Sequence, residues 1–199
     1  MQQSYDKHAD RYDRMLAPVE RRYLGKLRRE TLSLLPNDGT ILEIGAGTGA
    51  NFNFYPNCRQ AIASEISFNM IEIAKGKSAS ISLVQADAQD LPFPANHFDA
   101  AFATLVFCSV PDPAKALAEI IRILKPGGRI ILLEHVRPTG LLGPVFDLLN
   151  FATVAFIEDH FNRRTADIVR AAGFQNVTEK RSLVGILNLI VANSADVRA

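Results

Sequence analysis

The sequence predicts an α/β fold: a single domain whose mostly parallel sheet ends in an antiparallel hairpin and carries helices on both faces. Three observations support this prediction. Short apolar runs alternate with longer amphipathic runs through the middle of the chain, and a glycine-rich turn directly follows the first apolar run. Near the C-terminus two strand-like runs lie back to back. Strands that alternate with helices form parallel sheets, whereas two strands joined by a short turn pair antiparallel.

The individual elements follow from the same patterns. Apolar runs bounded by turn residues predict five strands, at Thr40–Ile44, Gln60–Ser64, Ser82–Gln85, Phe98–Ala103 and Arg129–Glu134. Amphipathic runs predict helices at Ser67–Lys75, Pro113–Leu124 and Arg163–Ala172. Pro126-Gly127-Gly128 separates the second of these helices from the fifth strand. The hairpin comprises Gln175–Leu183 and Ile186–Ala192 around Gly185, which completes a seven-stranded sheet.

The composition is that of one globular domain, 1–199, because 48% of its residues are hydrophobic and 22% are charged. A net charge of +1 argues against a general basic field for nucleic acid. Cys58 and Cys108 lack metal-ligand spacing, so we expect no metal, and we interpret Cys108 as a buried filler. We see neither a signal peptide nor an apolar run of about 20 residues, and therefore expect a cytoplasmic protein.

One early helix is strongly basic, and it contains Arg21, Arg22, Lys26, Arg28 and Arg29. Two interpretations of this helix remain open. Its basic side chains either form a solvated face or touch an anionic surface such as a membrane.

The strongest signal for a ligand site is Gly45-Ala46-Gly47-Thr48-Gly49, which directly follows the first strand. Glycine lets the backbone turn sharply and approach a ligand closely. A nicotinamide dehydrogenase would have its third glycine one residue later, with a pyrophosphate at the helix N-terminus. Glu43 would repel a pyrophosphate but suits a cationic amine, such as that of S-adenosylmethionine (SAM). The alternative is that Glu43 only caps the loop.

Further acids follow the next two strands. Glu65 ends the second strand about 20 residues past the first loop glycine, where a carboxylate accepts hydrogen bonds from ribose hydroxyls. It could instead be a surface acid at the start of the helix that Ser67 caps. Asp87 follows the third strand and could accept from an adenine amino group, and Ala88 leaves room for the ring. Leu105, at the end of the fourth strand, is a candidate for packing on the adenine face.

These motifs resemble a known family. Leu-Glu-Ile-Gly-Ala-Gly-Thr-Gly, Ala-Asp-Ala-Gln-Asp-Leu-Pro-Phe and Arg-Ile-Leu-Lys-Pro-Gly-Gly-Arg are similar to SAM-dependent class I methyltransferases of the ubiquinone/menaquinone-biosynthesis type. The resemblance implies a Rossmann-like methyltransferase domain. The opening Tyr5-Asp6 and Tyr12-Asp13 pairs extend the resemblance to an N-terminal helical lid, 1–35, that folds over SAM. The SAM-binding residues it implies are Tyr12, Glu43, Gly45, Gly47, Gly49, Glu65, Ile66, Asp87, Ala88 and Leu105.

A closer resemblance concerns the acceptor. Residues 49–56, 104–110 and 133–136 are similar to membrane-associated alkyl-thiol methyltransferases, and small phospholipid N-methyltransferases share the general layout. The chain departs from the thiol group because it lacks a hydrophobic N-terminal anchor. It also carries Asp159-His160-Phe161 where that group would have a Gly-Cys pair. The acceptor therefore stays open among an amine, a thiol and a quinone precursor, and peripheral contact with a membrane stays open with it.

Methyl transfer from a sulfonium is an in-line displacement that depends mainly on alignment and exclusion of water. His135 ends the fifth strand and is the first candidate for a general base; otherwise it only shapes the pocket. His160 and Asp159 are a second choice. The segment 137–162 is expected to recognise the substrate, and its apolar centre, Leu141–Ile157, favours an apolar or lipid-linked acceptor. That centre could instead be a cover helix, and the whole chain could bind SAM without catalysis.

Overall fold

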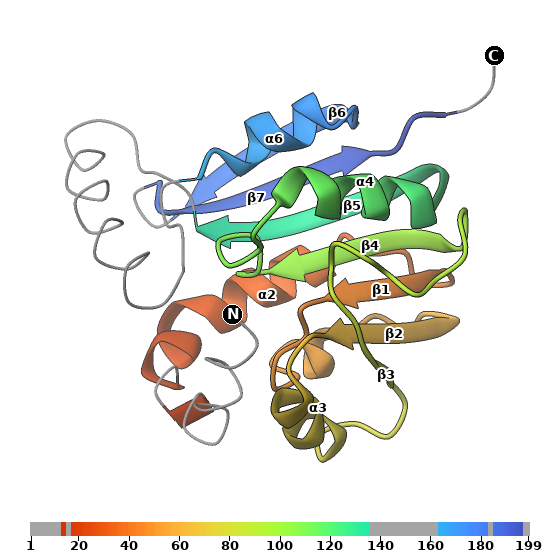
Figure 1. Cartoon of the computed structure of the whole chain (residues 1–199). Coiled ribbons are helices and arrows are strands. Elements are labelled where there is room, and N and C mark those ends of the chain that lie inside the picture. Colours follow the sequence, from red (N-terminus) through yellow and green to blue (C-terminus); the bar gives the residue numbers. More distant parts are fainter. Residues whose placement is uncertain (1–12, 15–16, 136–162, 183–184, 197–199) are drawn as a thin grey trace.

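The computed structural model describes residues 13–14, 17–135, 163–182 and 185–196. Its core is a seven-stranded sheet in the order β3-β2-β1-β4-β5-β7-β6 (Figure 1). Strands β1 to β5 pair in parallel, and β7 pairs antiparallel with both β5 and β6, as the sequence predicted. The strands are β1 (Thr40–Ile44), β2 (Gln60–Glu65), β3 (Ser82–Gln85), β4 (Phe98–Thr104), β5 (Leu124–His135), β6 (Gln175–Ser182) and β7 (Leu187–Asn193).

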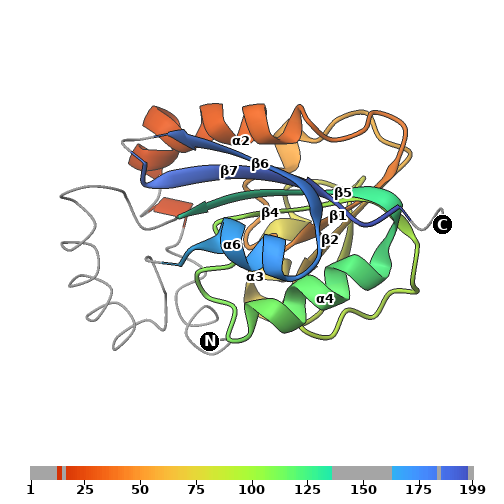
Figure 2. The same ribbon diagram turned by 90° about the horizontal axis from the view of Figure 1, so that it is seen from above.

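Helices cover both faces of the sheet. Figure 2 shows α2 (Gly25–Leu32) on one side, and α4 (Pro113–Ile123) and α6 (Thr165–Ala171) on the other. Leu32 of α2 belongs to a buried cluster with Ile41 and Phe102, whereas α4 packs its apolar stripe onto Leu42 and Leu132. The remaining helical segments are η1 (Glu20–Leu24), η2 (Phe52–Phe54) and α3 (Phe68–Lys75).

The helix starts follow from local chemistry. Ser67 caps α3, because its side chain accepts a hydrogen bond from Met70 N at 3.2 Å. Asp112 caps α4 in the same way through Lys115 N at 3.1 Å, and Pro113 occupies the first turn, where it sacrifices no hydrogen bond. Helix α3 is the next element after β2, and α4 is the next element after β4. Because β2 and β4 run in the same direction, both helices begin on the side of the sheet where these strands end.

The fifth strand is longer than predicted. It begins at Leu124 and includes Pro126-Gly127-Gly128, which the sequence suggested was a break before Arg129. The pairing with β4 shifts register here, from Phe98 opposite Leu124 to Ala100 opposite Arg129. Ser194, from the C-terminal segment, holds the irregular stretch by donating to Gly128 O and Lys125 O. A partner so distant in sequence cannot be read from a local pattern.

Several predictions lie outside the described residues. These are the substrate-recognition segment 137–162 with its apolar centre Leu141–Ile157, the Asp159 and His160 pair, Tyr12, and most of the N-terminal part of the 1–35 lid. Over the part of the chain that is described, no helix combines the length and the apolar character needed to cross a bilayer.

Candidate cofactor and active site

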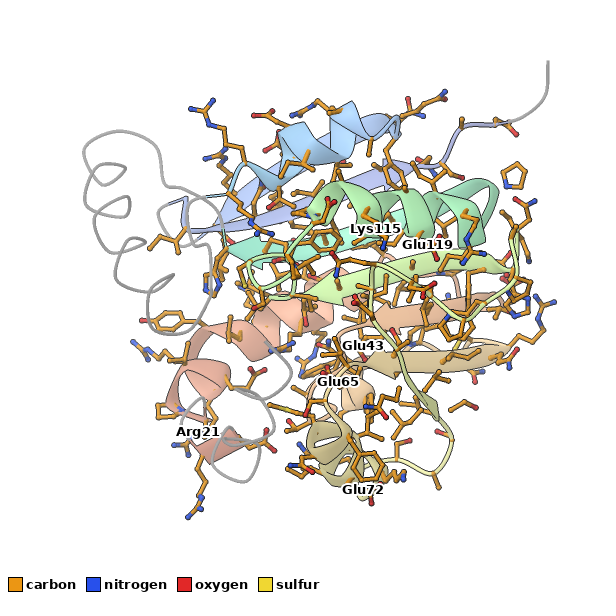
Figure 3. The ribbon with its side chains drawn as sticks, viewed as in Figure 1. Arg21, Glu43, Glu65, Glu72, Lys115 and Glu119 are labelled. Atoms are coloured by element: carbon orange, nitrogen blue, oxygen red, sulfur yellow. The ribbon has the colours of Figure 1, made fainter. Side chains whose placement is uncertain are left out.

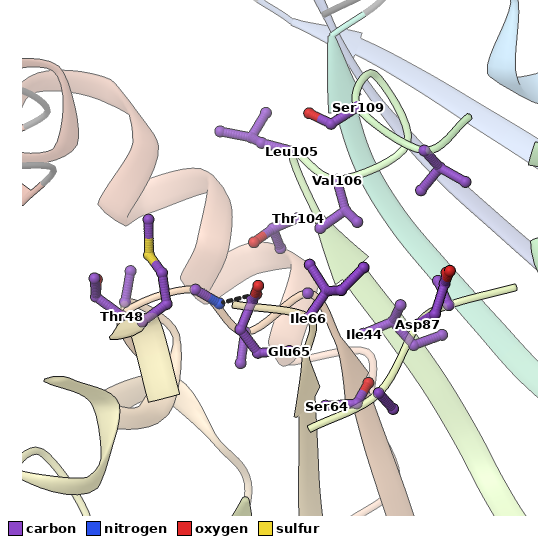
Figure 4. A pocket seen from close by; sticks show the side chains of 18 of the residues that line it. Ile44, Thr48, Ser64, Glu65, Ile66, Asp87, Thr104, Leu105, Val106 and Ser109 are labelled. Atoms are coloured by element: carbon purple, nitrogen blue, oxygen red, sulfur yellow. Dashed lines mark hydrogen bonds between the residues drawn. The ribbon is translucent and has the colours of Figure 1, made fainter. Parts of the chain in front are cut away.

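A cavity opens where β1, β2, β3 and β4 end. The space between its lining residues is about 870 Å³, a figure that includes open solvent at the mouth. The strand order reverses between β1 and β4, and crevices at such switch points bind ligands in open α/β sheets. Among the predicted binding residues, those that line the cavity are Gly45, Gly47, Glu65, Ile66, Asp87, Ala88 and Leu105 (Figure 4).

The glycine loop needs its glycines for different reasons. All three have positive φ: 66° at Gly45, 53° at Gly47 and 82° at Gly49. A Cβ at Gly45 would lie 2.6 Å from a methyl of Val106, and one at Gly49 would lie 2.5 Å from the Phe52 ring. A Cβ at Gly47 would meet only Met70 Sδ, at 3.9 Å. Gly45 and Gly49 thus permit packing, whereas Gly47 keeps the cavity open; Gly49 itself is not among the lining residues.

Glu65 connects β2 to this loop. Its Oε2 accepts a hydrogen bond from Gly47 N at 2.8 Å (Figure 4), and its Oε1 accepts one from Ser67 N at 2.9 Å. Glu65 lines the cavity, so it shapes the loop from the cavity wall. A bond from Glu65 to ribose hydroxyls stays a prediction.

Glu43 lies behind the loop and does not line the cavity. It is fully buried and accepts hydrogen bonds from Asn51 Nδ2 at 2.5 Å and from the Tyr55 hydroxyl. Burial raises the pKa of Glu43, although the hydrogen bonds and the charge of Arg28 oppose this shift. Figure 3 shows Glu43 and Glu65 close together at the ends of their strands. A direct bond from Glu43 to a ligand amine stays a prediction; in the structure Asn51 connects Glu43 to Arg28.

Arg28 is the functional residue that the sequence analysis misplaced. Only 5% of it is exposed, so it belongs neither to a solvated basic face nor to a surface-binding one. It lines the cavity and donates from Nη1 to Asn51 Oδ1 at 2.9 Å and to Thr104 Oγ1 at 2.5 Å. Its position was readable, because Leu24, Arg28 and Thr31 follow the helical spacing of a buried face.

The adenine-side candidates are where the sequence predicted them. Asp87 accepts hydrogen bonds from Gln89 N at 2.9 Å and from Gln89 Nε2, which orients its carboxylate beside Ala88. Leu105 has a φ of 61°, which is unusual for a residue with a branched side chain, and Leu105 N donates to Leu133 O at 2.8 Å. Strained residues of this kind cluster at ligand sites. Cys108, three residues after Leu105, is buried as expected.

His135 ends β5 at the expected edge, but it is not among the residues that line the described cavity. Burial lowers its pKa to about 4. The ring is therefore neutral near pH 7, and a conjugate acid with a pKa of about 4 makes it a weaker base than an exposed histidine. Its role as a general base stays a prediction.

Asp13 joins the N-terminal segment to the cofactor loop. It accepts hydrogen bonds from Thr48 Oγ1 at 2.5 Å and from Lys77 Nζ at 2.6 Å. Desolvation would raise the pKa of Asp13, but the bonds from Lys77 and Thr48 outweigh it and lower that pKa. The carboxylate therefore stays charged and fastens the segment across the glycine loop. Among the described residues, no group of three or more potential ligands could hold a metal ion.

The donor and acceptor set fits SAM. Glycine backbone, two acids on adjacent strand ends and the apolar side chains of Ile66 and Leu105 suit its adenosine part, and a buried cation lies beyond them. The comparisons with known proteins agree. A methyltransferase-domain family model matches residues 42–132.

Two curated relatives and one solved structure illustrate the likeness. The ubiquinone/menaquinone biosynthesis C-methyltransferase UbiE of Francisella tularensis subsp. novicida is 32% identical over 75% of this chain and 72% of the relative. The same enzyme of Pseudomonas savastanoi pv. phaseolicola is 29% identical over 79% and 73%. A SAM-dependent methyltransferase of Thermotoga maritima, described as a possible histamine N-methyltransferase, has a TM-score of 0.77 at 24% identity over 97% of this chain and 99% of that one. The protein therefore belongs to the SAM-dependent class I methyltransferases of the ubiquinone/menaquinone-biosynthesis type, with SAM as its methyl donor.

Proposed function

We propose that the protein methylates a small apolar or lipid-linked acceptor, which is an amine, a thiol or a quinone precursor. The observation that carries the proposal is the wall of the cavity beyond the glycine loop. It includes Val106, Val110 and Pro111. An apolar acceptor would bury its surface against these side chains, at about 25 cal/mol for each Å² removed from water.

The chain's own residues would supply alignment rather than acid–base chemistry. SAM brings a methyl group on a sulfonium, which is already activated for displacement. Among the described residues that line the cavity, the ionisable side chains are Arg28, Glu65 and Asp87, and the two acids lie at the adenosine end. This arrangement favours an acceptor whose nucleophile needs little help to ionise. Alignment alone can contribute up to about 7–11 kcal/mol to the transition state.

The acceptor would enter between two segments that flank the cavity. We propose the N-terminal residues 1–35 as a lid, supported by the bonds of Asp13 to Thr48 and Lys77. We propose 137–162 as the acceptor-recognition segment. The proposal is supported by Glu134 and Arg163, described residues on either side of it in sequence, which both bind the backbone of Phe107 next to the lining residue Val106.

Peripheral contact with an anionic membrane is part of the proposal. Arg21, Arg22, Lys26 and Arg29 are exposed along one helical segment, and Val19 and Tyr23 among them are each 46% exposed. Each basic residue near an anionic surface contributes about 1 kcal/mol to binding, and exposed apolar side chains can enter the interface. Arg28 does not contribute, because it is buried.

The test is turnover of isotopically labelled SAM with three acceptor classes: small thiols, phosphatidylethanolamine vesicles and quinone precursors. Labelled product should form with an apolar member of at least one class and should increase with the apolar length of the acceptor. Turnover restricted to small hydrophilic acceptors would overturn the apolar part of the proposal. SAM binding without turnover of any acceptor would indicate a SAM-binding protein or subunit.

A further inference from the structure

Arg28 has more hydrogen-bond donors than the described protein uses. A guanidinium carries five N–H groups. Nε donates to Glu20 Oε1 at 2.9 Å, and the two N–H groups of Nη1 donate to Asn51 Oδ1 and Thr104 Oγ1. Within the part of the chain that is described, no acceptor is bonded to Nη2. Arg28 is 5% exposed and lines the cavity, so a ligand in the cavity is the partner that this donor pair can reach.

The guanidinium is held in place before any ligand arrives. Its three bonds lead to η1, to Asn51 two residues past the glycine loop, and to the end of β4. The π turn of η1 makes the first bond possible. Gly25 N donates to Glu20 O, five residues back, so this turn contains one extra residue. Glu20 and Arg28 then share a face as two residues seven apart do in an α-helix.

The charged side chains around the cavity indicate that the ligand group at Arg28 is an anion. Arg28 is the sole cationic side chain among the described lining residues, and the two lining carboxylates belong to Glu65 and Asp87. Glu65 ends β2 and Asp87 follows β3, whereas Arg28 is bonded beside β1 and β4, which come next in the sheet order. The cavity therefore has an acidic end and a cationic end.

We propose that Arg28 binds the carboxylate of the methionine part of SAM through Nη2. SAM carries a cationic sulfonium and a cationic ammonium, and the carboxylate is its one anionic group. With the adenosine at Glu65 and Asp87, the methionine extends toward β4 and the carboxylate reaches Arg28. A buried, fixed guanidinium forms strong charge-assisted bonds with a carboxylate, because little side-chain entropy is lost.

The proposal is tested by removing the carboxylate from the ligand as well as the arginine from the protein. Calorimetry would measure the dissociation constants of SAM and of decarboxylated SAM for the wild type, Arg28→Gln, and Lys26→Gln as a control. Lys26 is an exposed lysine two residues away on the same helix. The wild type and Lys26→Gln should bind SAM about 10–150-fold more tightly than the decarboxylated ligand. Arg28→Gln should lose this preference through weaker SAM binding, with its affinity for decarboxylated SAM within about threefold of wild type.

Two results would overturn the proposal. One is a wild type that does not discriminate between the two ligands. The other is an Arg28→Gln variant that loses affinity for both ligands equally, because Arg28 would then only tie the helix to β4. If circular dichroism shows that Arg28→Gln is unfolded, Arg28→Lys replaces it. An ammonium retains the charge but not the fork of donors, so the preference should fall and should not rise above the wild-type value. No methyl acceptor is needed, so the outcome is independent of the proposed acceptor.

Discussion

Two glycines of the glycine loop have different roles, one in packing and the other in ligand binding. Gly45→Ala would place a Cβ 2.6 Å from a Val106 methyl, whereas at Gly47 the nearest heavy atom would be 3.9 Å away. At either position, alanine in the left-handed region would cost about 1–2 kcal/mol. The overlap of the new Cβ with Val106 at position 45 would add about 1–3 kcal/mol to this cost. Denaturant unfolding should therefore show a larger loss for Gly45→Ala. Calorimetry should show that Gly47→Ala weakens SAM binding while the fold persists. Equal losses of stability would contradict this assignment.

Glu65 should matter for both the cofactor and the loop. Glu65→Ala removes the acceptor of Gly47 N and Ser67 N together with the proposed ribose contact. We expect SAM affinity to fall about 10–150-fold by calorimetry. Glu72→Ala is the matched control, because Glu72 is an exposed acid on α3 (Figure 3). Unchanged SAM affinity in a folded Glu65→Ala variant would remove Glu65 from the site.

The buried imidazole of His135 should make the protein sensitive to acid. Its pKa is about 4 in the folded state and about 6.5 when unfolded, so the unfolded chain binds more protons between these values. Stability is therefore retained above pH 6.5 and falls as the pH drops toward 4, by about 2 kcal/mol at pH 5. His135→Gln should remove this part of the pH dependence. Denaturant unfolding at pH 7.5 and pH 5 checks it, and parallel pH profiles for the two proteins would refute it.

At the scale of elements, the sequence predicted what depends on neighbouring residues. The strand runs, the Ser67 cap and the hairpin are local patterns, and all three are present in the structure. The start of β5 was not predicted, because it depends on Ser194, which is distant in sequence. The helical spacing indicated the burial of Arg28, but not its bonds to the distant Asn51 and Thr104. The acids at the strand ends were placed correctly because parallel strands end at one edge, although the inward turn of Glu43 toward Tyr55 could not be inferred.

One loop is held from two sides. Glu134 accepts from Val106 N at 3.1 Å and from Phe107 N at 3.2 Å, and Arg163 donates to Phe107 O and Val110 O at 2.5 and 2.7 Å. Because Val106 and Val110 line the cavity, this double attachment fixes part of its wall. The loop can then keep Leu105 in its strained conformation.

Releasing the loop on the Arg163 side should loosen the cavity wall. We expect Arg163→Gln to lower the free energy of unfolding by about 1.5–3 kcal/mol, since charged hydrogen bonds are lost. The substitution should increase the rate of hydrogen exchange relative to wild type more across residues 105–111 than in the rest of the chain. Arg164→Gln, at the exposed neighbouring position, is the control and should behave as wild type. Exchange that is unchanged in this loop would mean that Glu134 alone holds it.

The charge of the whole molecule is nearly balanced, at +1, yet its distribution is uneven. Arg21, Arg22, Lys26 and Arg29 are exposed on one helical segment, and Figure 3 shows Arg21 pointing away from the sheet. A net charge near zero gives little long-range attraction to a membrane, so any binding must depend on this local group and must be screened by salt within a Debye length of about 10 Å at 0.1 M.

The protein should therefore co-sediment with anionic liposomes at low ionic strength, should bind zwitterionic liposomes far less, and should dissociate as salt is added. Replacing Arg21 and Arg22 by Gln should lower the partition coefficient about 30-fold, since each residue contributes about 1 kcal/mol. The charge-matched control replaces Arg59 and Lys115, which are exposed on other parts of the molecule, and should leave binding unchanged. Equal losses in both double variants would indicate attraction by net charge alone. No binding to anionic liposomes at low salt, together with turnover of a soluble acceptor, would show that the apolar cavity works without a membrane.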